Sequence, residues 1–155
     1  MWEAFQRFRA LDSKAQKIFG HAVILLPWVM GSLRLRGFKK TQANLQKNLR
    51  RVSQSKRLGT GIASVETVCR MVKAAGRYGF ARPNCLEESL VLWYLLQREC
   101  LTAALRIGVR KSQGEFEAHA WVEYQGTALN QGGEWTHPRY AAFEAEFSQL
   151  PGDEQ

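Results

Sequence analysis

Cys85 and His119 are the residues whose types and positions could do chemistry. Asn84 is a favourable N-cap residue and Glu87 stands three positions later, so a helix is predicted to begin at Cys85. The N–H groups and partial positive charge of a helix start favour a thiolate and could hold the oxyanion of a tetrahedral intermediate. Cys85 is therefore the candidate nucleophile; the alternative is that it is a small buried residue.

His119 lies in residues 116–124, where the series Phe, Ala, Ala, Val, Tyr alternates with the series Glu, His, Trp, Glu. A period of two residues predicts a strand. Its neighbours Ala118 and Ala120 belong to the opposite face of that strand. A strand holds an imidazole rigidly, and a thiolate nucleophile needs such a ring as ion-pair partner and as proton donor to the leaving amine. Read alone, a histidine is as readily a surface or core residue, so the hypothesis depends on the pair with Cys85.

A third side chain normally orients the imidazole, and a predicted return strand over residues 127–131 offers two amides. A two-residue hairpin turn would put Asn130 on the face of His119, whereas a three-residue loop would put Gln131 there. Either amide oxygen can accept a hydrogen bond from the ring, and neither carries charge. Both remain candidates, against the alternative of ordinary polar residues at a strand end.

The remaining cysteines and histidines are assigned structural roles. Cys69 is predicted inside a helix and Cys100 at a helix end, both as packing residues, and His21 and His137 are taken as structural. No Cys-x-x-Cys pair or metal-ligand spacing is present, so we expect neither a metal nor a cofactor. An odd number of cysteines favours a reducing compartment, and we expect a cytoplasmic protein.

The elements that must position these residues follow from periodicity and capping. Helices are predicted over residues 2–11, from a cap at Ser13 with a kink at Pro27, from a cap at Thr41, from a cap at Ser64, over residues 85–99, and from Pro138 through Phe147. Strands are predicted over residues 105–110, 116–124 and 127–131. The expected fold class is α+β, with a basic helical region over residues 1–57, a linker, and a catalytic domain over residues 62–150.

The charge of the chain is concentrated in its first part. The 155 residues carry a net charge of +8, and residues 1–57 hold 13 Lys or Arg against two acidic residues. Such a segment could contact lipid headgroups or an acidic partner, or simply expose solvated helix faces. It has no basic run interleaved with aromatics, so we expect no nucleic-acid partner. The apolar stretch over residues 22–30 contains Pro27 and is shorter than a membrane span.

Four motifs resemble one family. They are Cys85 followed by LEESL, the LRIGVRK segment over residues 105–111, FEAHAWVE over residues 116–123, and residues 126–130. Together they resemble the cysteine leader peptidases of lasso-peptide biosynthesis, the microcin-processing type, whose protease domain belongs to the transglutaminase-like superfamily. The resemblance covers roughly residues 80–147, and the basic helical front is also similar.

The resemblance implies a papain- or transglutaminase-like core, a helix followed by a small antiparallel sheet, with a helical N-terminal extension. It implies removal of the leader from a ribosomally made precursor peptide before a separate ATP-dependent cyclase closes the macrolactam. Cys85 would be the nucleophile and His119 its base, and the family's usual Asp falls at Gln131. A winged-helix module that binds the leader would be a separate protein, because the front of this chain shows no strand pattern.

Two other functions are compatible with the same residues. A related enzyme could form an amide or transfer the acyl group, since an amine can resolve the acyl-enzyme as well as water can. A non-catalytic scaffold could instead bind a peptide or contact a membrane peripherally through its basic helices, and the absence of the usual Asp favours that alternative.

Overall fold

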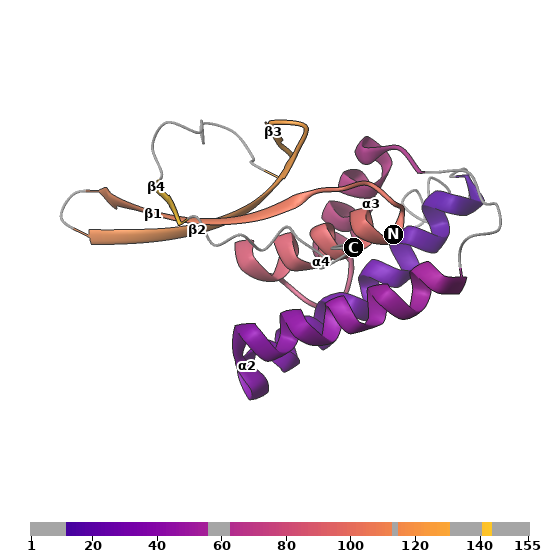
Figure 1. The fold of residues 1–155 in the computed structure, drawn as a ribbon, viewed down its shortest axis with the longest axis horizontal. Coiled ribbons are helices and arrows are strands. Elements are labelled where there is room, and N and C mark those ends of the chain that lie inside the picture. The colour runs from indigo at the N-terminus through magenta and orange to yellow at the C-terminus, as the bar shows by residue number, and fades with distance from the viewer. Residues whose placement is uncertain (1–11, 56–62, 113–114, 131–140, 144–155) are drawn as a thin grey trace, which may run out of the picture.

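The computed structural model describes residues 12–55, 63–112, 115–130 and 141–143. Its elements, shown in Figure 1, are α2 (Ser13–Ser55), α3 (Val65–Tyr78), α4 (Cys85–Arg98), β1 (Ala104–Ser112), β2 (Glu115–Tyr124), β3 (Thr127–Ala128) and β4 (Ala141–Phe143). The helix predicted over residues 2–11 lies outside the described residues. The structure confirms the α+β class, with a helical front and a helix followed by a small antiparallel sheet.

The α2 helix is a hairpin of two arms that meet at Gly37 (Figure 1), where φ is 76° and ψ is 174°. Glycine adopts positive φ readily, so the helical backbone breaks at Gly37. At Pro27, where a kink was predicted, the backbone stays helical. Thr41 was predicted to cap the second arm, but it lies buried inside the helix, donates a hydrogen bond to the carbonyl of Gly37 (2.8 Å), and contacts Ser32 (2.9 Å). The predicted cap at Thr41 was therefore wrong, because Thr41 lies within the second arm and not at its start. Its side chain stabilises the turn between the two arms.

The two shorter helices begin where their capping residues predict. Oγ of Ser64 accepts a hydrogen bond from the amide of Thr67 (3.2 Å) at the start of α3. In α4 every residue from Leu90 to Leu96 is buried, so this helix packs against neighbours on all sides. Figure 1 shows α4 between the sheet and the α2 hairpin.

The sheet has the order β3-β2-β1-β4, and the β1–β2, β1–β4 and β2–β3 pairs are all antiparallel. Strands β2 and β3 are joined by a two-residue turn in which Gln125 and Gly126 have φ of 49° and 78°. Positive φ at both positions is typical of the type I′ hairpin turn. The turn confirms the register that pairs Val122 with Leu129, whose amide donates to the Val122 carbonyl (2.9 Å).

Residues 141–143 correct a second prediction, since they form a strand where a helix from Pro138 through Phe147 was expected. Phe143 pairs with Ile107, and Ala141 pairs with Val109. The pairing partner is the edge of β1 that β2 leaves open, so backbone hydrogen bonds to a preformed strand decide the conformation. A short apolar run is locally ambiguous between helix and strand, and tertiary pairing resolves it.

One hydrophobic core joins the front of the chain to the sheet. Ala22, Leu26 and Val29 of α2 lie in the same cluster as the buried residues of α4 and as Leu105 and Val122 of the sheet. The hydroxyl of Tyr94 also donates to Oδ1 of Asn48 (2.8 Å), which ties α4 to the second arm. The division into regions 1–57 and 62–150 remains a prediction, and both regions contribute to this core.

Candidate active site

Cys85 is the first residue of α4, and its side chain is exposed. The predicted capping box is present: the amide of Asn84 donates to Oε2 of Glu87 (2.8 Å), and the amide of Glu87 donates to Oδ1 of Asn84 (3.0 Å). Within the described chain, no acceptor contacts the amides of Cys85 and Leu86. Two N–H groups at the start of α4 are thus available beside the thiol for an oxyanion.

The first turn of α4 also carries two carboxyl groups. Glu87 is 5% exposed and is held by the capping box. Burial raises the pKa of Glu88, and the positive charge of Lys73 acts in the opposite direction.

The other two cysteines differ from Cys85. Cys69 is partly buried against the core, and burial raises the pKa of its thiol to about 11, so it is protonated at neutral pH. Its assignment to packing is confirmed. Cys100 was also assigned to packing, but it is exposed, with φ of 61° after the end of α4, so that assignment was wrong. A left-handed residue at the helix end turns this side chain outward.

His119 lies near the middle of β2 and is half-buried. Its cross-strand partner on β1 is Gly108, which has no side chain and leaves room beside the imidazole. The ring of Trp121 lies on the same face, with the two ring centroids 6.0 Å apart and an interplanar angle of 15°. His119 is therefore bordered by a glycine on one side and an indole on the other.

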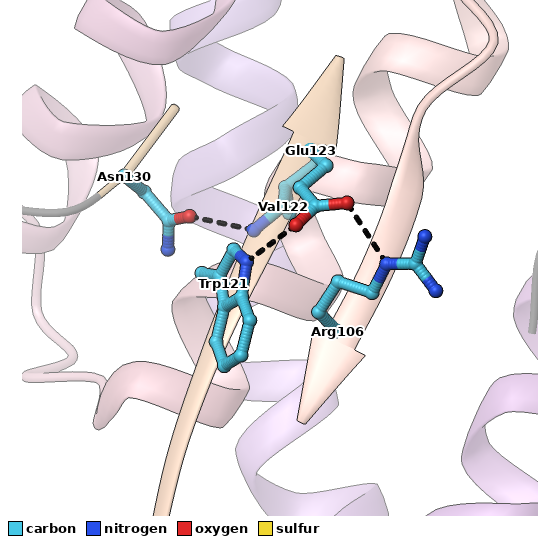
Figure 2. A network of polar contacts seen from close by, with 5 residues as sticks. All are labelled: Arg106, Trp121, Val122, Glu123 and Asn130. Atoms are coloured by element: carbon cyan, nitrogen blue, oxygen red, sulfur yellow. Dashed lines mark hydrogen bonds and ion pairs between the residues drawn. The ribbon is translucent and has the colours of Figure 1, made fainter. Parts of the chain in front are cut away.

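Trp121 is held in place by a polar network on the same face of the sheet (Figure 2). Its Nε1 donates to Oε1 of Glu123 (3.1 Å), and Nε of Arg106 donates to Oε2 of Glu123 (2.9 Å). Trp121 is only 1% exposed. Side chains alternate along a strand, so this face is opposite the one on which Val122 joins the helical core. The network fixes the indole against which His119 lies.

Ser89 joins the helix of Cys85 to the strand of His119. Ser89 lies one turn after Cys85 on the same side of α4, and its Oγ donates to the carbonyl of Ala120 (3.0 Å). Nδ2 of Asn130 donates to Ser89 Oγ (2.8 Å), while Oδ1 of Asn130 accepts from the amide of Val122 (2.9 Å; Figure 2). These contacts lie on the edge of β2 just beyond the two residues of β3.

The direction of the chain then gives the level of Cys85 along β2. Because α4 ends just before β1 begins, and Ala104 of β1 pairs with Glu123 of β2, α4 runs in the same direction as β2. One helical turn spans about 5.4 Å, or roughly two strand residues. Counting back one turn from the Ser89–Ala120 contact brings Cys85 near the level of residues 118–119 along β2, and the side chain of His119 lies on the face of β2 opposite Val122.

The two predicted orienting residues have different outcomes. The turn geometry gives Asn130 the register that was required for it to face His119, but its described hydrogen bonds go to Ser89 and Val122. Gln131 lies outside the described residues. An orienting role for either amide remains a prediction.

Sequence reasoning missed Ser89 and the residues that flank His119. Ser89 could have been found as a small polar residue one turn after the candidate nucleophile on the same helix face. Trp121 and Glu123 follow His119 at two-residue intervals, so strand alternation alone places all three on one face. Which polar atoms they contact depends on register and rotamers that the sequence does not specify.

Two further features lie apart from this arrangement. The described residues contain no group of three or more His, Cys, Asp or Glu placed to hold a metal ion. A hollow of about 310 Å³ is lined by residues including Trp28, Asn48, Tyr94 and Arg98. Arg98 and Cys85 are at opposite ends of α4, about 20 Å apart at 1.5 Å per residue. The hollow is therefore not part of the candidate catalytic arrangement.

Comparison with known proteins agrees with this geometry. Residues 22–144, most of the chain, match the family described as the transglutaminase-like superfamily. No curated protein and no solved structure gives a significant match. The superfamily includes cysteine peptidases and acyltransferases. With a cysteine at a helix start and a histidine on the second strand of the following sheet, the chain belongs to the transglutaminase-like superfamily.

Proposed function

We propose that this protein is a cysteine peptidase that removes the leader from a ribosomally synthesised lasso-peptide precursor before a separate cyclase forms the macrolactam. The observation that carries the peptidase proposal is the placement of Cys85. Its exposed thiol begins α4, beside two available amides, on a helix that Ser89 joins to β2 one residue from His119. The lasso-precursor substrate is supported by the resemblance of the segments around Cys85, residues 105–111 and His119.

The proposed reaction has two steps. His119 takes the proton of the Cys85 thiol, the sulfur attacks the scissile carbonyl carbon, and the amides of Cys85 and Leu86 donate to the oxyanion. The C–N bond then breaks, and the imidazolium of His119 gives its proton to the leaving amine. This leaves the leader's carbonyl bound to sulfur as a thioester. Water, deprotonated by His119, hydrolyses the thioester and regenerates the thiol.

The proposal includes the partners and the compartment. A separate winged-helix protein would present the leader, and the ATP-dependent cyclase would take the new N-terminus of the core. The three cysteines form no disulfide, which is compatible with a reducing cytoplasm. The reaction as written uses the chain's own groups and a water molecule.

The test is cleavage of the precursor by the full chain together with the leader-binding protein, followed by mass spectrometry of the products. Cys85→Ala and His119→Ala should abolish cleavage, a loss of at least about 10³-fold for a nucleophile or its base. Cys100→Ala is the matched control, because Cys100 is also an exposed thiol on a residue flanking α4. It should cleave at the wild-type rate.

Other results would change the function. Leader and core peptides with free termini indicate hydrolysis, whereas a product joined to an added amine indicates acyl transfer by the same thioester. If Cys85→Ala matches the wild type in cleavage and in production of the mature peptide, the chain is a scaffold and the proposed enzyme function is wrong.

A further inference from the structure

The outer face of the first arm of α2 has exposed apolar side chains. Ile24 is 72% exposed, Trp28 is 42% exposed and Leu35 is 87% exposed. Their spacing of four and seven residues places them on one side of the helix. The opposite side, with Ala22, Leu26 and Val29, is at most 1% exposed and belongs to the core. We call Ile24, Trp28 and Leu35 the outer stripe.

The described chain leaves this face open. Gly20 and Gly31 flank the stripe, and a Cβ at either glycine would have no described atom within 4 Å apart from its own chain neighbours and the adjacent backbone of the same helix. Ile24 and Trp28 also form part of the rim of the hollow between the two arms and α4. Exposed apolar side chains this close together are typical of a contact surface.

Positive charge lies beside the stripe. Between Ser13 and Ser55 the hairpin has nine Lys or Arg and no Asp or Glu. Four of these cations, Arg34, Arg36, Lys39 and Lys40, are exposed on both sides of Gly37 at the tip of the hairpin, next to Leu35. We call these four residues the basic tip. A surface that has exposed apolar side chains next to exposed cations is complementary to a partner that has an anionic outer layer over an apolar layer.

We propose that the outer stripe and the basic tip of α2 dock the protein on the surface of a membrane that contains anionic lipids. Leu35, Trp28 and Ile24 would enter the boundary between headgroups and acyl chains, and the basic tip would contact lipid phosphates. Duplex nucleic acid would meet the cations but would have no use for three exposed apolar side chains in a row.

The contact is peripheral. By length and composition the helix over residues 13–52 is apolar enough to cross a membrane. It turns back at Gly37, however, and its inner side is buried against α3 and α4 as part of one core. A spanning arrangement would have to expose that core. This inference concerns where the protein works and is independent of the proposed reaction.

The experiment measures flotation of the full chain with vesicles of phosphatidylcholine alone and of phosphatidylcholine mixed with phosphatidylglycerol. We expect binding only to the anionic vesicles, weakened by added salt. Lys39→Gln with Lys40→Gln should reduce partitioning roughly 30-fold, at about 1 kcal/mol per cation. Leu35→Gln should reduce it roughly tenfold.

Matched variants remove the same groups elsewhere. Lys73→Gln with Arg77→Gln lowers the net charge equally from exposed positions on α3, and Phe80→Gln removes a fully exposed hydrophobic residue. Both should bind vesicles like the wild type, and melting by circular dichroism should show that every variant is folded. Equal binding to neutral and anionic vesicles, equal losses in tip and control variants, or binding to a DNA duplex but to no vesicle would each overturn the proposal.

Discussion

Two exposed thiols, Cys85 and Cys100, flank the same helix in opposite electrostatic surroundings. Cys85 begins α4, where N–H groups point outward, whereas Cys100 follows its last turn, where carbonyl groups do. An oxyanion formed beside Cys85 meets hydrogen-bond donors, and one formed beside Cys100 meets acceptors. Backbone position therefore favours Cys85 over Cys100 as the proposed nucleophile.

The Ser89–Asn130 contact gives a prediction at the scale of single side chains. Ser89→Ala removes the donor to Ala120 and the acceptor for Asn130, which should cost about 1–3 kcal/mol in the free energy of unfolding. Because Ser89 also positions α4 against β2, cleavage by the folded fraction should fall as well. Asn130→Ala should have the same two effects, measured by urea unfolding and by the rate of precursor cleavage.

Ser32→Ala is the matched control for these variants. Ser32 is also a buried serine with a side-chain hydrogen bond, to Thr41 at the hairpin turn. It should lower stability while leaving the cleavage rate of the folded protein unchanged. If Ser89→Ala also loses only stability, Ser89 is a structural residue and does not position the catalytic pair.

At the scale of elements, local chemistry predicted where α3 and α4 begin, and non-local pairing decided the conformation of residues 141–143. The caps at Ser64 and Asn84 and the hairpin after Tyr124 depend on residues within four positions of each other, so the sequence identifies them. The strand at residues 141–143 depends on pairing with Ile107 and its neighbours, more than thirty residues away, which local periodicity cannot indicate. Non-local pairing is the physical reason for that error.

The α2 hairpin shows the same limit in a helix. Pro27 predicted a kink and Thr41 a cap, but the chain turns at Gly37. The chain turns at Gly37 because α2 packs against α3 and α4, and the Thr41–Gly37 hydrogen bond lies inside the turn. The candidate site was predictable to a similar degree: Cys85, its cap and the strand of His119 followed from the sequence, whereas the Ser89 link required tertiary structure.

At the scale of the whole molecule, the basic front, α4 and the sheet share one core. Leu26 of α2 is 1% exposed and lies in the same cluster as residues of α4 and β2. Placement of Cys85 therefore depends on the α2 hairpin, because α4 lies between that hairpin and the sheet (Figure 1). The match to the superfamily, which begins at residue 22, likewise includes most of the hairpin.

A substitution in the core tests whether α2, α4 and the sheet unfold together. Leu26→Ala should lower the free energy of unfolding by about 2–5 kcal/mol, in a single transition seen alike by far-ultraviolet and near-ultraviolet circular dichroism. Leu35→Ala, on the exposed side of the same arm, should change it by less than about 0.5 kcal/mol. Two separate transitions, with only one shifted by Leu26→Ala, would show that the front is an independent domain.

The most direct test of the central claim is the covalent intermediate itself. The full chain, mixed with the precursor and the leader-binding protein and quenched in acid within one turnover, should gain the mass of the leader as a thioester that hydroxylamine removes. Peptide mapping should place this adduct on Cys85. His119→Ala should lose the adduct or form it far more slowly. Cleavage without any adduct on Cys85, or a thioester found on Cys100, would contradict the account.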